Sequence, residues 1–139
     1  SDQVALFDDQ ILGKPHTQER ACAQLRAFSG QRVRFVTGLA LLDTAEHRHW
    51  VGYQHYDVVF RRLTDTEIST YVAREQPLQC AGSFRMESLG ITLFERLEGD
   101  DPNSLIGLPL ILLCRWLREA GADPLAASAT DVANGDQGN

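Results

Sequence analysis

The stretch RVRFVTGLALL, residues 32–42, decides the fold of this chain. In its first half, Val33 and Phe35 share one face of a predicted strand, and Arg32 and Arg34 share the other. In its second half the residues are apolar on both faces, a pattern typical of strands that are covered on both sides. We therefore expect a strand that starts at a sheet edge and ends buried.

A second long strand is predicted directly after the first. Residues 43–48 form a polar turn, and residues 50–62 alternate again, with Tyr56, Val58 and Phe60 on one face. Two long strands joined by a short turn favour an antiparallel pair.

Shorter elements are predicted on both sides of this pair. A hairpin is expected from residues 4–7 and 11–12, and a short strand from residues 91–97. Helices are expected over residues 17–29, 64–75 and 109–121, and the last of them should bury Leu110, Leu113, Cys114 and Leu117. The order β-β-α-β-β-α-β-α indicates a mixed α/β sheet.

Composition narrows the class of protein. The 139 residues carry a formal net charge of −6, and 43% of them are hydrophobic, so one domain with a real core is expected. The acidic balance argues against a sequence-independent binder of nucleic-acid polymers, which needs clustered positive charge. The longest apolar run, residues 108–114, is far below the ~20 residues that span a bilayer. We expect neither a nucleic-acid polymer nor a membrane among the partners.

The cysteines indicate a compartment. Cys22, Cys80 and Cys114 are odd in number, widely spaced and free of any CxxC pattern. This usage favours reduced thiols in a cytoplasmic protein over a disulfide framework. The sequence as a whole does not determine the oligomeric state, and a homodimer is compatible with it.

Motifs of several common chemistries are absent from the sequence, which contains no GxGxxG, GxxxxGK[ST], HExxH or GxSxG. His47 and His49 have a spacing that would allow both to bind one metal ion from a strand, but they lie in a polar stretch that we interpret as a solvated turn. Trp50 and Trp116 could stack on a base, yet we interpret them as packing residues.

Three residues remain as candidates for chemistry. Asp2 precedes an apolar strand, and Lys14, the only lysine among 13 basic residues, follows the other arm of the same predicted hairpin. Because a hairpin brings its ends together, the Asp2 carboxylate and the Lys14 ammonium group can face one pocket, the first toward metal or water and the second toward phosphate. Glu87 lies in a glycine-rich segment, residues 80–90, that is too irregular to serve packing alone. The plain alternative is that these charged groups are only solvated.

Several motifs then follow one another along the chain: SDQV (1–4), ILGKP (11–15), FSG (28–30), VTG (36–38), CAGSF (80–84), GITLFERLEG (90–99), and DPN (101–103) followed by GLPL (107–110). In this order they resemble the Maf family of nucleoside triphosphate pyrophosphatases, from Ser1 to about Leu125. The resemblance is greatest to the 7-methyl-GTP pyrophosphatase branch, marked by SDQV, by AGSF, and by Glu87 where other branches carry Gln.

The resemblance implies a hydrolase with an elongated α/β fold like that of inosine triphosphatases, whose twisted, largely antiparallel sheet is flanked by helices. It implies a divalent metal (Mg, Mn or Co) and cleavage between the α and β phosphates to give a nucleoside monophosphate and pyrophosphate. By motif, Asp2 corresponds to the family's catalytic aspartate and a metal ligand. Lys14 corresponds to the lysine that contacts phosphate, and Glu87 to the position that helps hold the base.

The resemblance also sets the expected limits and alternatives. In the family a strand, a basic SxSxxR loop and a metal-site Glu precede the region matched here. We therefore expect residues 1–125 to be a Maf-like domain without its N-terminal third, and the 139-residue chain alone to have little or no pyrophosphatase activity. Residues 126–139 are expected to be a disordered tail. The alternative functions are a non-catalytic nucleotide-binding or septum-formation interaction protein and, disfavoured by Glu87, a pyrophosphatase of the UTP/dTTP branch.

Overall fold

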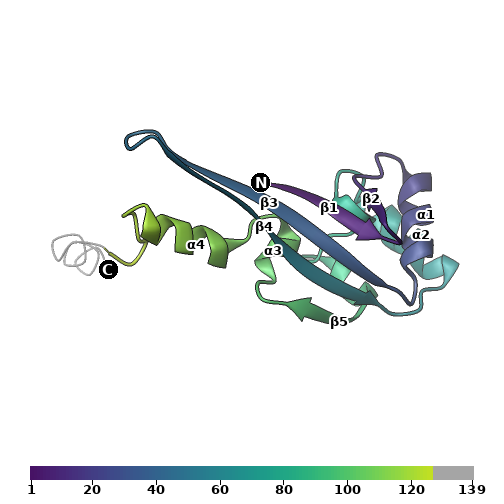
Figure 1. Cartoon of the computed structure of the whole chain (residues 1–139). Coiled ribbons are helices and arrows are strands. Elements are labelled where there is room, and N and C mark those ends of the chain that lie inside the picture. The colour runs from purple at the N-terminus through teal and green to yellow at the C-terminus, as the bar shows by residue number, and fades with distance from the viewer. Residues whose placement is uncertain (127–139) are drawn as a thin grey trace, which may run out of the picture.

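The computed structural model describes residues 1–126, so all but the first residue of the predicted tail lies outside the described part. Its centre is a five-stranded sheet in the order β2-β1-β3-β4-β5 (Figure 1). The strands are β1 (Asp2–Phe7), β2 (Gln10–Leu12), β3 (Arg32–Asp43), β4 (Arg48–Phe60) and β5 (Phe94–Gly99). Every pairing among these strands is antiparallel, which confirms the predicted sheet and its central long pair.

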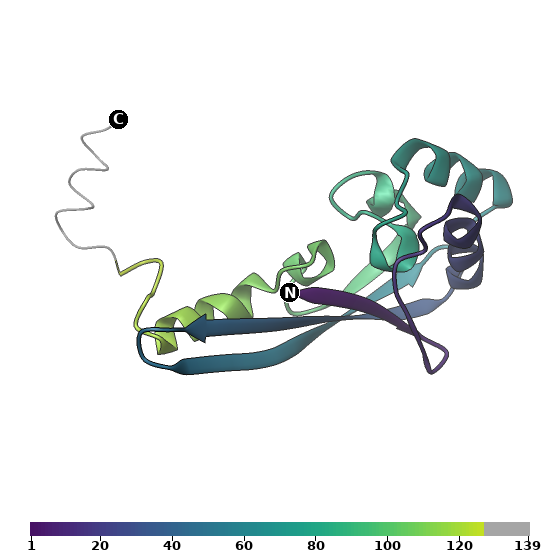
Figure 2. The ribbon, with the colours of Figure 1, turned by 90° about the horizontal axis from the view of Figure 1, so that it is seen from above.

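The helices lie on one side of the β3–β4 pair (Figure 2). They are α1 (Gln18–Phe28), α2 (Asp65–Glu75), α3 (Asn103–Ile106) and α4 (Leu110–Glu119), with two short 3-10 helices, η1 (Ala81–Ser83) and η2 (Leu89–Leu93). Thr17 caps α1, and Thr64 forms the predicted capping box with Glu67 at the start of α2. None of the helices within residues 1–126 has the length and apolar character needed to cross a membrane.

The main core lies where α1 and α2 cover the sheet. Alternation along β3 and β4 points Phe35 and Phe60 inward, where they meet Phe28 of α1 and the aromatic rings of Phe84 and Phe94. On the opposite, solvent-facing side of the sheet the strands carry charged residues that form ion pairs. One face of the sheet is therefore apolar and covered, and the other is polar.

The far end of the β3–β4 pair is built differently. Asp2, the first residue of β1, pairs with Gly38 of β3, and Gly99, the last residue of β5, pairs with Tyr56 of β4. Residues 39–55 therefore extend beyond both neighbouring strands as a two-stranded arm. Helix α4 covers one face of this arm (Figure 2). The other face is open, with Leu42 72% and Val51 74% exposed. The prediction that the first strand ends buried is therefore wrong, because the strand runs past its neighbour and only one face has a cover.

Helix α4 covers the arm with a different face from the predicted one. The predicted stripe is Leu110, Leu113, Cys114 and Leu117, whereas the structure buries Leu112 and Trp116. Of the predicted four, Leu113 is partly buried against this cluster, and Leu110 is 39% exposed. The reason is the largest side chain of the helix. A Cβ atom at Gly52 would lie 3.0 Å from the Trp116 ring, so this glycine leaves the space in which the indole packs.

The predicted strand over residues 91–97 is only partly correct. Residues 91–93 belong to η2, and β5 starts at Phe94. The Thr92 hydroxyl donates to the Leu89 carbonyl at 2.6 Å. Such a local side-chain bond stabilises a turn at the expense of an extended strand.

Candidate functional site

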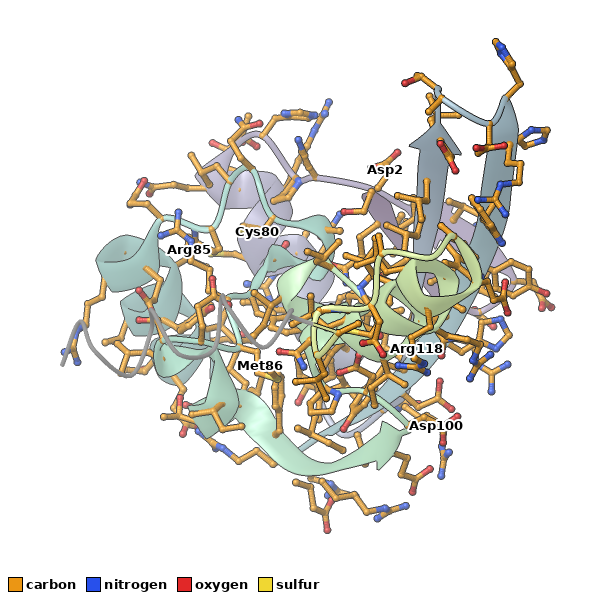
Figure 3. All side chains as sticks on the ribbon, turned by 90° about the vertical axis from the view of Figure 1, so that its left-hand side faces the viewer. Asp2, Cys80, Arg85, Met86, Asp100 and Arg118 are labelled. Atoms are coloured by element: carbon orange, nitrogen blue, oxygen red, sulfur yellow. The ribbon has the colours of Figure 1, made fainter. Side chains whose placement is uncertain are left out.

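A pocket of about 260 Å³ lies beside the start of β1. Four stretches of the chain line it, with the residues Ser1, Asp2, Gln3, Lys14, Gln79, Cys80, Ala81, Phe84, Arg85, Glu87, Leu105, Ile106 and Gly107. The three candidates from the sequence, Asp2, Lys14 and Glu87, thus line the same pocket. Figure 3 labels Asp2 on one wall, and Cys80 and Arg85 on another, which we call the pocket wall (residues 79–87).

Asp2 is held at the first position of β1. Its backbone pairs with Gly38 of β3, and its Oδ1 accepts the Gln3 backbone N–H at 2.9 Å. The Gln3 amide donates to the Thr37 hydroxyl at 3.0 Å and to the Ser104 carbonyl at 2.7 Å, which ties the start of β1 to α3. No described residue donates to the second Asp2 oxygen, so this oxygen is available to a molecule in the pocket.

Lys14 lies on the loop between β2 and α1. The next residue, Pro15, is buried, and the His16 N–H donates to the Leu78 carbonyl at 2.9 Å. The Lys14 side chain is exposed, and no carboxylate within residues 1–126 forms an ion pair with it. The backbone around Lys14 is thus held in place, and its ammonium group has no ion-paired carboxylate among the described residues. Both features suit a group that binds an anion.

Glu87 lies in a turn of the irregular segment between η1 and η2. The backbone of this segment is unusual, because Gly82 and Ser83 both have left-handed φ values, 73° and 65°. The backbone at Gly82 also lies close to the Phe35 ring, since a Cβ at this position would be 2.5 Å from it. The glycine-rich sequence thus marks a wall pressed tightly onto the core.

Side chains of α1 and α2 anchor this wall. Within the wall, Ser83 Oγ donates to Gln24 Oε1 at 2.6 Å, and the Arg85 N–H donates to the Tyr71 hydroxyl at 2.8 Å. Just beyond the wall, the Leu89 N–H donates to the Glu75 carboxylate. Burial raises the pKa of the Tyr71 phenol well above its ordinary value, so this hydroxyl stays protonated near neutral pH. The wall that carries Glu87 is therefore fixed to both helices.

Arg85 is a pocket residue that the sequence did not reveal. The Cys80 side chain beside it raises the pKa of its guanidinium group, which keeps the positive charge. With Arg85 the pocket is lined by two carboxylates, Asp2 and Glu87, and two cations, Lys14 and Arg85. No periodicity marks Arg85, because residues 84–88 are neither helix nor strand.

The described residues of the pocket do not form a complete metal site by themselves. Within residues 1–126 no three His, Cys, Asp or Glu side chains lie together. Mg²⁺ is usually bound by one or two carboxylates together with substrate phosphates, not by an all-protein cage. The exposed Asp2 carboxylate is the ligand that fits this arrangement, because one of its oxygens is available.

The other residues weighed from the sequence lie outside the pocket. Trp116 packs in the arm, and the Trp50 indole N–H donates to Glu119 at 2.9 Å, so both act as packing residues, as interpreted. His47 and His49 are exposed at the arm's tip. The three cysteines, all within the described residues, are free thiols, in agreement with the prediction.

Comparisons with a family model and with curated proteins point to the same family. The family model described as Maf-like protein matches residues 1–120. Three proteins named 7-methyl-GTP pyrophosphatase are similar: that of Chromohalobacter salexigens is 71% identical over 125 residues, or 90% of this chain. That of Pseudoalteromonas translucida is 54% identical over 93% of the chain, and that of Nitrosococcus oceani is 56% identical over 87%. The matches span 65%, 64% and 61% of the length of these curated relatives.

Proposed function

Because this chain belongs to the Maf family, we propose that its pocket serves a nucleoside triphosphate pyrophosphatase acting on 7-methyl-GTP or a similar modified nucleotide. One observation carries the proposal: Asp2, Lys14 and Glu87, each from a different motif, line one pocket. The relatives named 7-methyl-GTP pyrophosphatase support the choice of substrate. The three free thiols support a cytoplasmic setting, where disulfides are rare.

The proposed reaction is attack of water on the α phosphorus. A bond forms between the water oxygen and the α phosphorus while the bond from that phosphorus to the bridging oxygen breaks, and pyrophosphate leaves with the bonding electrons. The available Asp2 oxygen can take the proton that the water loses. The Lys14 ammonium group, as a compact point charge, can neutralise a phosphate oxygen.

The pocket fits a divalent metal, Mg²⁺, Mn²⁺ or Co²⁺, that is shared with the nucleotide. Asp2 would hold it, because its carboxylate is exposed to the pocket and has an oxygen without a described donor. A metal bound there would polarise phosphate oxygens and lower the pKa of a coordinated water. Asp2 thus has two alternative roles, metal ligand or proton acceptor, because both would use the same available oxygen.

Glu87 suits recognition of a methylated guanine. The Watson–Crick edge of guanine presents adjacent N–H donors, and a carboxylate can accept both, whereas the amide of Gln offers one acceptor and one donor. Methylation at N7 adds positive charge to the purine and strengthens a hydrogen bond to an ionised partner. Glu87 therefore favours 7-methyl-GTP over GTP and over pyrimidine nucleotides.

A nucleotide panel tests the proposal. The 139-residue chain and the complete Chromohalobacter relative are incubated with 7-methyl-GTP, GTP or UTP and with Mg²⁺ or Mn²⁺, and both melting temperature and pyrophosphate release are measured. We expect 7-methyl-GTP to raise the melting temperature of both proteins most, and the relative to release pyrophosphate from it. Binding by both with release by neither supports the interaction-protein alternative, and no binding by this chain contradicts the proposal. Release by the 139-residue chain alone would overturn the expectation of low activity.

Matched variants test the residues. Glu87→Gln should lower the preference for 7-methyl-GTP over GTP by about tenfold, whereas Glu95→Gln, an exposed carboxylate outside the pocket, should leave it unchanged. Lys14→Gln should weaken the binding of all three nucleotides alike. An unchanged preference in Glu87→Gln would remove this residue from base recognition.

A further inference from the structure

Gln24 of α1 connects two of the stretches that line the pocket. Its Oε1 accepts the Ser83 hydroxyl at 2.6 Å, and its Nε2 donates to the Gly13 carbonyl at 3.4 Å. Ser83 lies within the pocket wall, and Gly13 directly precedes Lys14. One half-buried amide therefore joins the wall that carries Glu87 to the loop that carries Lys14.

The bond to Ser83 lies at a strained position. Ser83 has a φ of 65°, a backbone conformation that residues other than glycine rarely adopt, and its side chain is fully buried. Gln24 is the one partner of its hydroxyl among the described residues. Strained backbone persists where the surroundings hold it, and it concentrates at ligand sites.

The bond to Gly13 completes the support of Lys14. On the far side of this residue, the His16 N–H donates to the Leu78 carbonyl at 2.9 Å. Lys14 is thus bracketed by two ties, both of which lead toward the wall. The bonds from Tyr71 and Glu75 differ, because they join the wall and the adjoining Leu89 to α2 and do not touch the Lys14 loop.

We propose that Gln24 is a positioning residue that sets the spacing between the Lys14 loop and the Glu87 wall through its single amide group. The proposal rests on the proposed function, in which these walls contact the phosphates and the base of one nucleotide. A neutral amide is required, because one end must accept from Ser83 and the other must donate to Gly13. Holding the two walls in place before binding reduces the ordering cost for a ligand that needs both.

A nested pair of variants tests the connection without any ligand. Ser83→Ala removes only the tie to the wall, whereas Gln24→Met removes both ties with little change in volume. In hydrogen exchange of the free chain, we expect Ser83→Ala to speed exchange about three- to tenfold in peptides covering residues 80–87 only. Gln24→Met should do so there and in residues 11–17. Gln18→Met is the matched control, since this residue of the same helix is exposed and, among residues 1–126, its side chain bonds only Gln76.

Ligand affinity separates positioning from general support of the fold. The two probes are 7-methyl-GTP, which needs both walls, and inorganic pyrophosphate, which needs only the phosphate contact. Gln24→Met should weaken 7-methyl-GTP binding about tenfold and pyrophosphate binding less than about twofold. Equal weakening of both, or unchanged exchange in both segments, would overturn the proposal. If the parent chain binds neither probe, the proposed function fails, while the exchange data still decide whether Gln24 joins the walls.

Discussion

At one end of the β3–β4 pair, a continuous aromatic core joins two helices to the sheet, whereas at the other end the arm is covered by α4 alone. The first end includes Phe28, Phe35 and Phe60, none more than 1% exposed, and it lies directly beneath the pocket wall. The second has a small cluster centred on Trp116. The pocket wall thus lies against the larger core, whereas Asp2, on the other side of the pocket, pairs with Gly38 at the base of the arm.

The largest expected effect comes from opening the core. Phe60 is fully buried, and its ring centroid lies 5.4 Å from that of Phe28 and 5.4 Å from that of Phe94. Phe60→Ala should lower the free energy of unfolding by about 3–5 kcal/mol, because it leaves a cavity among rings that cannot collapse into it. Urea unfolding measures this. A loss below about 1 kcal/mol would mean that the core is no more tightly packed than the arm.

A glycine in each region gives a matched pair. A Cβ at Gly82 would lie 2.5 Å from the Phe35 ring, and the residue has a φ of +73°, whereas a Cβ at Gly52 would lie 3.0 Å from Trp116 with no such backbone constraint. Gly82→Ala should therefore cost about 2–4 kcal/mol and weaken nucleotide binding. Gly52→Ala should cost about 1 kcal/mol and leave binding unchanged. Urea unfolding and 7-methyl-GTP titration of both variants check the ranking, and equal costs would contradict it.

Much of the fold could be predicted from local sequence patterns, and the predictions that were wrong depend on contacts between distant segments. The alternation around Phe35 and the capping box at Thr64 each depend on neighbours in the sequence, and both were predicted correctly. Which face of α4 is buried depends instead on the space above Gly52, which lies on a distant strand. Likewise, the exposure of Leu42 depends on which segments lie over the second half of β3, and α4 covers only one face there. A residue pattern contains no information on such partners.

The pocket residues likewise divide into those that local motifs indicate and those that depend on distant contacts. Asp2, Lys14 and Glu87 lie in recognisable motifs, so sequence alone indicated all three. Arg85 reaches the pocket only through an irregular turn, and Gln24 reaches it only through contacts with segments that are distant in the chain. Neither position has a spacing or period that could have marked it.

Removing the main side chain of the arm should have a smaller and more local effect. Trp116 is 7% exposed and packs over Gly52 with Leu39 and Leu112. Trp116→Ala should destabilise the docking of α4 by about 2–3 kcal/mol, less than the core variant, since fewer groups surround it. Hydrogen exchange should rise in residues 110–119 while 7-methyl-GTP affinity stays within twofold, about 0.4 kcal/mol. A loss of affinity comparable to that of Gly82→Ala would show that the arm does support the pocket.

The smallest expected effect is the pH dependence of stability that comes from one acidic residue in each region. Glu67 caps α2 near the core, and its hydrogen bond from Arg61 is the main cause that lowers its pKa from 4.5 to about 2. Asp43 lies at the tip of the arm, where the Arg48 guanidinium lowers the pKa of its carboxyl. In both cases the folded state holds the proton more weakly than the unfolded state does. The resulting stability is therefore present above the unfolded pKa and is lost as pH falls toward the folded value.

For Glu67 the window runs from pH 4.5 down to about 2. Glu67→Gln keeps the capping geometry but loses the charge, so it should lower the melting temperature by about 1–4 °C at pH 7, with the difference vanishing across that window. Asp43→Asn should change the melting temperature less, because the arm's turn can fray while the core stays folded. Thermal unfolding of the parent and both variants at pH 7, 4.5 and 2.5 measures this. A larger penalty for Asp43→Asn would mean that the arm, and not the core, limits the stability of the fold.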